Sequence, residues 1–261
     1  NKFDHNSEDY LRLLISSMDY AFHDRAKFLG DPDFFNVPQK KLTSKKYAKD
    51  IYKLIENKKS PPKIKIDIVE GEETTHFSVL DKWGNAVSNT YTLNTAYGSG
   101  IIPSGTGILM NNEMDDFSSK PGHPNAYGLV GSEANKIEPN KTPLSSMTPV
   151  IVFLKDKPFL ITGSPGGSTI ITTVLQEVLN ILDFNMTLEE SSEKSRVHFQ
   201  HLPDLVFHEK FEEGLLENLK KEKKVINRKL GEVHSILSKK DSIESYSDWR
   251  RPDGKASAFY K

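Results

Sequence analysis

The sequence predicts a layered α+β domain, on the strength of three features. The chain has 261 residues, 36% of them apolar, which is enough for one large domain with a sizeable core. Apolar residues recur at helical spacing before residue 58, whereas strand-like stretches begin after residue 74. Further strands are followed by helices and then again by strands, without an internal repeat. Such blocks of strands and helices are typical of layered α+β folds.

Two helices are expected in the first part of the chain, over residues 8–24 and 43–58. The Gly-Asp-Pro-Asp sequence at residues 30–33 marks a turn between them. Residues 58–73 are polar, rich in lysine and interrupted by proline, so we expect an exposed, flexible segment. This segment ends directly at Thr74.

Strands are expected after Thr74, and helices after those. The expected strands cover residues 76–81, 86–93, 107–111, 149–154 and 158–162. The first two form a hairpin around a Gly-Asn turn. The expected helices cover residues 167–182, 188–196 and 211–224, with Thr187 as N-cap of the second. Residues 234–261 are expected to form two short strands around a turn at residues 249–254.

The composition excludes several classes of protein. A formal net charge of -1 gives no electrostatic reason to expect nucleic acid or an anionic membrane as partner. The lysine runs at residues 40–46, 58–65 and 220–229 are interpreted as solvated faces. The absence of cysteine excludes disulfides, thiolate chemistry and zinc fingers. No apolar run approaches the roughly 20 residues of a membrane span. The start, Asn1-Lys2-Phe3-Asp4, indicates a fragment or a processed form.

Thr74 is a candidate nucleophile on chemical grounds. An ordinary threonine hydroxyl is a weak nucleophile, but cleavage of the Glu73–Thr74 bond would give Thr74 a free α-amine. That amine has a reference pKa of about 7.7–8.0 and lies within reach of its own Oγ. Threonine with its N-terminal amine is one form of the nucleophile-and-base pair. The Thr74-Thr75-His76 sequence alone leaves open the alternative that threonine simply favours a strand.

Two polar stretches downstream are candidates for substrate binding. In a strand, Thr90, Thr92 and Asn94 share one face, and such a row needs partners or a ligand unless it is a solvent-facing edge. The acidic stretch at residues 113–116 lacks the long, glycine-containing loop that calcium prefers. It fits an ammonium group better, and a solvated acidic loop is the alternative.

Two short stretches further on carry hydroxyls and glycines. Ser145 and Ser146 stand between apolar residues, where a plain polar turn is the alternative. The Gly-Ser-Pro-Gly-Gly-Ser-Thr sequence at residues 163–169 follows a strand and opens a helix. Backbone amides at such a turn can hold an anion or a developing oxyanion. The sequence is neither a Walker phosphate loop nor an esterase elbow, and a tight strand–helix turn is the alternative.

Three histidines in the second half are possible metal ligands by residue type. His198 and His201 form a His-x-x-His pair, and His208 lies nearby. No further ligand stands at a recognisable spacing. We therefore interpret all three as surface residues rather than a metal site.

Taken together, these stretches closely resemble the γ-glutamyltranspeptidase family. The matching blocks are TTHFSVLDKWGNAVSNTYTLNT, LMNNEMDDFS, KPGHPNAYGLVG, PNKTPLSSMTP and GSPGGSTIITTVLQ, with YAFHDRAKFLGDPDF upstream. The resemblance covers nearly the whole chain. It implies an αββα sandwich of the N-terminal-nucleophile hydrolase type, only part of which is present. Residues 1–73 would end the large subunit, and residues 74–261 would form the small subunit.

The resemblance also implies roles for individual residues. Thr74 would be the nucleophile, released by self-cleavage and oriented by Thr92. The amides of Gly166 and Gly167 would form the oxyanion hole. Asn94, Glu113 and Asp116 would bind the substrate α-amino group. Ser145 and Ser146 would bind its α-carboxylate. Residues 121–131, centred on Tyr127, match the lid loop that some members have.

The implied reaction is attack of Thr74 Oγ on the γ-carbonyl of glutathione or another γ-glutamyl amide. Water or an acceptor amino acid or peptide would then resolve the γ-glutamyl ester, and no metal or organic cofactor is required. A periplasmic or secreted location is implied as well. The alternatives are a hydrolase-only member, a member acting on poly-γ-glutamate, and an unprocessed, non-catalytic homologue.

Three departures from the family pattern qualify the resemblance. The family's large subunit supplies an arginine for the α-carboxylate from a position upstream of this chain, so that the rest of that subunit is an expected partner. Thr169 and Thr142 each stand where many relatives have arginine. Both substitutions are expected to alter local packing or charge rather than the chemistry.

Overall fold

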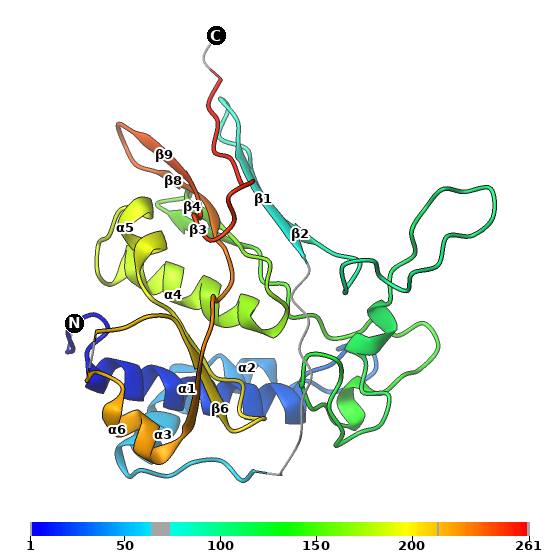
Figure 1. Ribbon diagram of the computed structural model, residues 1–261, viewed down its shortest axis with the longest axis horizontal. Coiled ribbons are helices and arrows are strands. Elements are labelled where there is room, and N and C mark those ends of the chain that lie inside the picture. The colour runs from blue at the N-terminus through cyan, green and yellow to red at the C-terminus, as the bar shows by residue number, and fades with distance from the viewer. Residues whose placement is uncertain (1, 64–73, 213, 260–261) are drawn as a thin grey trace.

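The computed structural model describes residues 2–63, 74–212 and 214–259 (Figure 1). The helices are α1 (Glu8–Phe28), α2 (Gln39–Leu42), α3 (Lys45–Glu56), α4 (Ile170–Leu182), α5 (Leu188–Glu193) and α6 (Glu217–Glu222). The strands are β1 (Thr75–Leu80), β2 (Ala86–Tyr91), β3 (Val150–Leu154), β4 (Lys157–Thr162), β5 (Val197–His198), β6 (Leu205–His208), β7 (Lys224–Asn227), β8 (His234–Ser238) and β9 (Ile243–Ser247). Short 3-10 turns cover Glu113–Asp116, Glu133–Asn135 and Gly167–Thr169.

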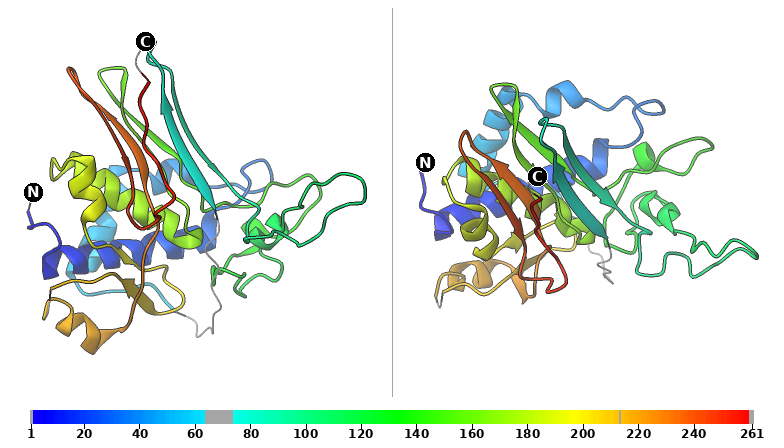
Figure 2. Two further views of the ribbon diagram at one scale, coloured as in Figure 1. Left: turned by 45° about the horizontal axis from the view of Figure 1, so that its top comes forward. Right: turned by 90° about the horizontal axis from the view of Figure 1, so that it is seen from above.

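A sandwich of two sheets forms the upper part of the molecule in Figure 1. Strands β3, β4, β8 and β9 form one sheet in that order, and the antiparallel β1–β2 hairpin packs against it through β4 and β8. Helices α4 and α5 lie on the other side of the four-stranded sheet (Figures 1 and 2). Leu160 and Leu237 are buried there against Ile181 and Leu188 of the helices. The described residues thus form helix, sheet and sheet layers.

The β1–β2 hairpin has a polar inner face and an apolar outer face. On the inner face, Ser78 Oγ donates to the carbonyl of His234 at 2.8 Å, and Ser88 Oγ donates to the carbonyl of Thr162 at 2.8 Å. The side chains exposed on the outer face are Phe77, Val79, Val87 and Tyr91. Alternation along a strand places these two sets on opposite sides. The hairpin is therefore bound to the larger sheet mainly by polar groups.

Helix α1 organises the lower part of the molecule. Ser7 caps it, because its Oγ accepts from the amide of Tyr10 at 3.3 Å. Its buried face, including Leu11, Leu14 and Met18, packs against Phe199 and the three-stranded sheet β5-β6-β7. Helix α3 lies beside α1 (Figure 1). The periodicity of residues 8–24 predicted this helix, which continues to Phe28.

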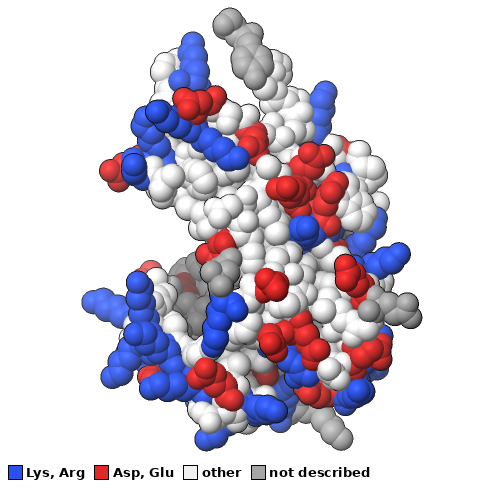
Figure 3. Space-filling model, turned by 90° about the vertical axis from the view of Figure 1, so that its left-hand side faces the viewer, with Lys and Arg blue, Asp and Glu red and all other residues white. Residues whose placement is uncertain are grey.

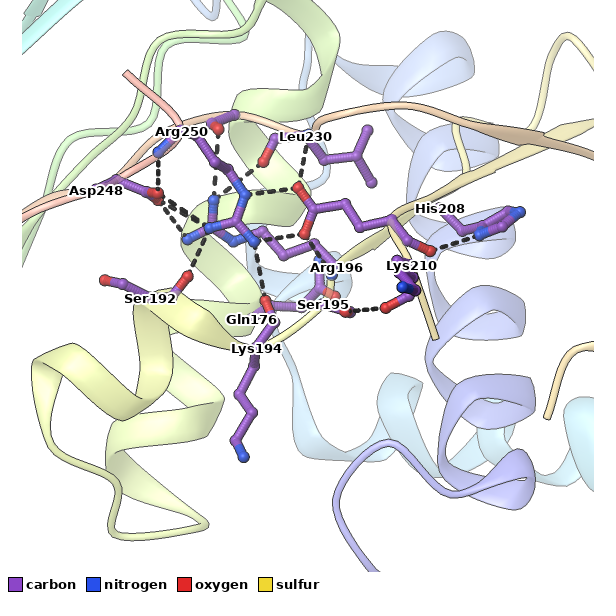
Figure 4. Close-up of polar contacts among 12 residues, drawn as sticks. Gln176, Ser192, Lys194, Ser195, Arg196, His208, Lys210, Leu230, Asp248 and Arg250 are labelled. Atoms are coloured by element: carbon purple, nitrogen blue, oxygen red, sulfur yellow. Dashed lines mark hydrogen bonds and ion pairs between the residues drawn. The ribbon is translucent and has the colours of Figure 1, made fainter. Parts of the chain in front are cut away.

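A buried ion network connects the C-terminal region to the middle of the chain (Figure 4). Arg250 bonds to Asp248 at 3.0 Å and to Glu209 at 2.5 Å, and Arg196 bonds to Asp248 at 2.8 Å. All four side chains are buried. Arg196 also donates to the carbonyl of Leu230 at 3.0 Å. Each charge has an opposite partner and backbone hydrogen bonds, which buried charges require.

Several predicted elements are wrong, and glycines explain two of them. Residues 107–111 form a loop, because Gly105 and Gly107 adopt positive φ of 78° and 66° and interrupt a strand. The helix predicted over 211–224 is confined to α6, since Gly214 has φ 90° just before it. Pairing of β8 with β9 places the final turn at residues 239–242, where 249–254 was predicted.

Three strands were not predicted at all. Strands β5, β6 and β7 are two to four residues long and carry too little alternation to be recognised in the sequence. The other predictions are confirmed: the β1–β2 hairpin, the β3–β4 pair, α3, α4 preceded by its 3-10 turn, and α5 capped by Thr187 through a capping box. Basic and acidic side chains both occur on the face shown in Figure 3, and many of the basic ones gather at its lower left.

Candidate active site

A small pocket at the edge of the sandwich brings together eight of the ten residues that the sequence singled out. The eight are Thr74, Thr92, Asn94, Asp116, Tyr127, Ser145, Ser146 and Gly167, and Met147 and Ile170 complete the lining. Glu113 and Gly166 lie close to lining residues in the sequence. Segments as far apart as Thr74 and Gly167 therefore meet at one point.

Thr74 immediately precedes β1 and is 9% exposed. The position of β1 is fixed by its second residue, His76. The His76 ring lies so close to Gly163 that a Cβ on that glycine would be 2.2 Å from the imidazole. Only glycine allows this approach, which brings the start of β1 next to the turn between β4 and α4.

The His76 ring is neutral, and both of its nitrogens are hydrogen-bonded. Ser78 Oγ donates its proton to a carbonyl, so it accepts from His76 Nε2 at 3.2 Å. Nδ1 then accepts from Thr90 Oγ1 at 2.7 Å. Burial, and secondarily the nearby His234, lower the pKa of His76 to about 4. The histidine next to the threonine pair thus fixes the strand and does not titrate near neutral pH.

Thr92 and Asn94 lie just beyond the end of β2. Thr92 Oγ1 accepts from the amide of Asn94 at 2.9 Å, and Asn94 has a positive φ of 76°. Tyr127 is buried and donates its hydroxyl proton to the carbonyl of Asn94 at 2.5 Å. The segment predicted to be a lid therefore contacts the pocket through its tyrosine.

The acidic pair lies in the 3-10 turn at Glu113–Asp116. Burial raises the pKa of Asp116 to about 7, and the charge of Glu113 contributes to this rise. Burial also raises the pKa of Glu113. Its Oε1 is buried and has no hydrogen-bond partner in the described part of the chain. Two poorly solvated carboxyls at this spacing are suited to a cationic ligand.

Arg25, from the last turn of α1, is a site residue that the sequence analysis missed. Its guanidinium donates to Ser146 Oγ at 3.1 Å and is attracted by Asp116. Burial lowers the pKa of Arg25 to about 10, opposed by Asp116, so it is charged at neutral pH. Its position continues the buried face of α1 one turn beyond Phe22, and this spacing was the available signal.

Asn135 connects the acidic pair to the serine pair. Its Nδ2 donates to the carbonyl of Asp116 at 2.8 Å, and its Oδ1 accepts from the amide of Leu144 at 3.0 Å. Leu144 directly precedes Ser145. The side chain is buried, so one asparagine sets the spacing of two pocket segments.

The glycine pair lies at the N-terminus of α4, where backbone amides lack helical partners. Gly166 has φ 130° and Gly167 φ 56°, which are backbone conformations that favour glycine. A Cβ on Gly166 would lie 2.6 Å from Thr169 Oγ1. Thr169 is itself buried and donates to the carbonyl of Gly166 at 2.7 Å. The threonine that departs from the family pattern therefore stabilises this turn.

The prediction that the histidines lie at the surface is wrong for two of the three. His198 is fully buried between Thr172 and Gln200, and His201 is buried against Asp19. His208 is half-buried. These rings join α1 and α4 to the β5–β6 region. No cluster of three or more potential metal ligands occurs among the described residues.

Comparison with known proteins identifies the family of the chain. The family model of gamma-glutamyltranspeptidases matches residues 1–258. The chain belongs to the gamma-glutamyltranspeptidase family. It is 48% identical over 244 residues to a glutathione hydrolase proenzyme of Escherichia coli (strain K12), and 48% identical over 208 residues to that of Pseudomonas aeruginosa. These matches cover 90% and 79% of the chain but only 42% and 37% of the relatives. The chain thus spans less than half the length of these relatives.

Solved structures confirm the fold. A mutant γ-glutamyltranspeptidase of Helicobacter pylori is 49% identical, with a TM-score of 0.65 over 68% of this chain and all of that one. The γ-glutamyltranspeptidase of Pseudomonas nitroreducens with L-DON is 43% identical, with a TM-score of 0.66 over 72% of this chain and 99% of that one. The chain therefore has the α+β architecture of the N-terminal-nucleophile hydrolases. None of the helices in the described ranges is long and apolar enough to cross a membrane.

Proposed function

We propose that this chain is the catalytic part of a γ-glutamyltranspeptidase that also hydrolyses glutathione. The observation that carries the proposal is the pocket where Thr74 meets Asp116, Ser146 and the N-terminus of α4. An amino acid head group needs a carboxylate for its ammonium and donors for its carboxylate, and the pocket offers both. The family membership and the glutathione hydrolase names of the relatives support the same substrate class.

In the proposed reaction, Thr74 Oγ attacks the γ-carbonyl of the donor, with the Thr74 α-amine accepting the hydroxyl proton. The amides of Gly166 and Gly167 stabilise the developing oxyanion at the start of α4. The protonated amine of the donor leaves, and a γ-glutamyl ester remains on Thr74. Water or an acceptor amine then attacks the ester and restores the threonine.

The substrate head group is proposed to bind across the pocket. Glu113, Asp116 and Asn94 hold the α-ammonium group, while Ser145 and Ser146 hold the α-carboxylate. Arg25 orients Ser146 and adds positive charge near that carboxylate. Thr92 orients the nucleophile, and Tyr127 covers the site.

We also propose that the Glu73–Thr74 bond is cut by the protein itself. Thr74 Oγ bonds to the Glu73 carbonyl carbon, the C–N bond breaks, and the hydroxyl proton ends on the freed amine. Water then hydrolyses the ester to a Glu73 carboxylate and a Thr74 hydroxyl. The relatives are named proenzymes, and an acivicin-inhibited γ-glutamyltranspeptidase of known structure uses its C-terminus in autoprocessing and catalysis. Glu73 lies outside the described residues.

The proposed cut divides the chain into residues 1–73, the end of a large subunit, and residues 74–261, the small subunit. The second piece would be about 72% of this chain. The Pseudomonas nitroreducens chain, aligned over 99% of its own length, also covers 72% of this chain. The proposed partner is the rest of the large subunit, which supplies a further arginine. A periplasmic or secreted location remains a prediction.

The test follows the intact precursor by mass under denaturing conditions. The wild type should give pieces whose boundary lies between Glu73 and Thr74, corresponding to 73 and 188 residues of this numbering. Thr74→Ala should remain one chain without γ-glutamyl transfer, while Thr75→Ala should still be cut. A correctly folded wild type that stays intact after long incubation contradicts the proposal.

A further inference from the structure

A partly buried cluster of charged side chains binds the chain at Lys63, after α3 and before Thr74. Lys63 is the last described residue before the ten residues, 64–73, that lead to Thr74. Its Nζ lies 2.6 Å from Asp204 Oδ1 and 3.7 Å from Asp19 Oδ2. It also lies 4.8 Å from the centre of the buried Phe199 ring. The prediction of an exposed, flexible segment over residues 58–73 is thus wrong at Lys63, and its residues 64–73 lie outside the described ones.

The partners of Lys63 are Asp19 on α1 and Asp204, which directly precedes β6. Asp19 is on the buried face of α1 and accepts from His201 Nδ1 at 2.7 Å if that nitrogen carries the proton. Asp204 also binds Lys223 at 2.9 Å, and Lys223 lies 4.5 Å from the same Phe199 ring. Burial alone would raise the pKa of Asp204, but hydrogen bonds from the two lysines lower it below its usual value. Both lysines were predicted to be in solvated runs.

The few residues before Lys63 are constrained as well. Tyr20 on α1 donates its hydroxyl proton to the carbonyl of Lys59 at 3.0 Å. Pro61 and Pro62 follow, and proline fixes φ and restricts the residue before it. Pro61 is buried. The chain is therefore attached to α1 at two places, Lys59 and Lys63, with a stiff connection between them.

We propose that Lys63 is a positioning residue for self-cleavage, because its ion pairs fix the upstream end of the segment that carries the Glu73 carbonyl. The inference rests on the proposed function, in which that carbonyl must meet Thr74 Oγ. Fixing one end of a connecting segment reduces the conformations that its other end must lose to reach a given point. Once the bond is cut, this constraint no longer affects the chemistry at Thr74. The anchor thus acts on maturation and leaves γ-glutamyl turnover unchanged.

The test compares the first-order rate of precursor cleavage with kcat/KM of the cut enzyme. Lys63→Ala and Asp204→Asn should each slow cleavage by roughly 1.5- to twofold, because the nearest upstream attachment is then Lys59 rather than Lys63 and the span before Thr74 lengthens from ten residues to 14. Lys63→Arg keeps the charge and should cleave at the wild-type rate. After cleavage is complete, all variants should have the wild-type kcat/KM for a γ-glutamyl anilide.

Two matched controls separate anchoring from general support of the fold. Lys223→Ala removes the other lysine of the cluster but keeps the Lys63–Asp204 pair, and Lys59→Ala removes an exposed side chain from the same segment. Both should cleave at the wild-type rate. The inference is overturned, and the proposed function is not, if Lys63→Ala and Asp204→Asn cleave at the wild-type rate. The same holds if Lys223→Ala slows cleavage as much as they do. A wild-type precursor that is never cut overturns the proposed function and this inference with it.

Discussion

At the scale of single residues, the pocket contains charges that are incompletely balanced without a ligand. The Asp116 carboxyl has a pKa of about 7, first because of burial and then because Glu113 lies beside it. This pKa is above the usual value of 3.8, so the ligand-free protein loses stability as the pH rises through this interval. A bound ammonium group reverses the effect, because it favours the ionised carboxyl. Binding should therefore strengthen where ligand-free stability declines.

Inhibition by L-glutamate is expected to show this titration. The inhibition constant should decrease about tenfold from pH 6 to pH 8, because the Asp116 carboxylate forms over that interval. Asp116→Asn should bind weakly and with little pH dependence. Asp115→Asn is the matched control, since Asp115 bonds instead to the amide of Ala126. This variant should keep the tenfold change, with a slightly lower midpoint because the charge of Asp115 also raises the pKa of Asp116. The same slope in Asp116→Asn would assign the titration to another group.

Arg25 is expected to act through Ser146. Lysine at position 25 keeps the charge but loses the planar fork, so Arg25→Lys should raise KM for a γ-glutamyl anilide by about tenfold with a smaller change in kcat. Ser146→Ala should raise KM too, and the double variant should show less than the sum of the two effects because the residues share a hydrogen bond. Arg12→Lys, on the exposed side of α1, serves as control. Additive effects would contradict the coupling.

At the scale of elements, the turn from β4 into α4 fixes the positions of β1 and of the glycine pair. Gly163 allows His76 and hence β1 to approach, while Gly166 and Gly167 turn the chain into the helix. Ser164 Oγ accepts from the amide of Glu232 at 2.9 Å, which ties the turn to the segment before β8. One short turn thus positions both the strand that follows Thr74 and the amides of Gly166 and Gly167.

Gly166→Ala should lower kcat rather than affinity. The new Cβ would lie 2.6 Å from Thr169 Oγ1, and φ of 130° is strained for alanine, so the amides of the turn must move. Loss of one oxyanion donor costs about 100-fold or more in kcat. KM should change less than about threefold, as measured by steady-state kinetics. Gly84→Ala in the hairpin turn, also at positive φ but with open space around it, should retain activity.

At the scale of the whole molecule, the chain exposes apolar surface that a closed sandwich would bury. The outer face of the β1–β2 hairpin exposes Phe77, Val79, Val87 and Tyr91 by 44–55%. Such contiguous apolar area is typical of an interface. The E. coli relative is more than twice the length matched by this chain. Within the chain, the ion network around Arg250 holds α5, β6 and β9 together near the C-terminal end.

Removing one member of that network should destabilise the assembled protein strongly. Arg250→Met leaves Glu209 and part of Asp248 buried without their partner, which costs about 3–5 kcal/mol of unfolding free energy. Arg12→Met breaks the exposed pairs with Glu8 and Glu222 and should cost about 1 kcal/mol or less. Urea unfolding of the processed enzyme measures both. Equal costs would mean that the buried network contributes no more than surface pairs.

The sequence by itself determined the family, the long helices, the β1–β2 hairpin and eight of the ten residues that line the pocket. Periodicity and turn residues are local properties, and the blocks around Thr74, Asp116, Ser146 and Gly167 are each contiguous in the chain. The roles given to those residues remain proposals.

Tertiary structure alone decided the rest. Burial of His198 and His201, the approach of Arg25 to Ser146, and the ion pairs of Lys63 depend on residues that are distant in the chain. The short strands β5, β6 and β7 likewise exist only because α1 and the chain around them provide partners. A local pattern contains no information about which distant group will neutralise a charge or exclude water from it. That depends on how the layers pack.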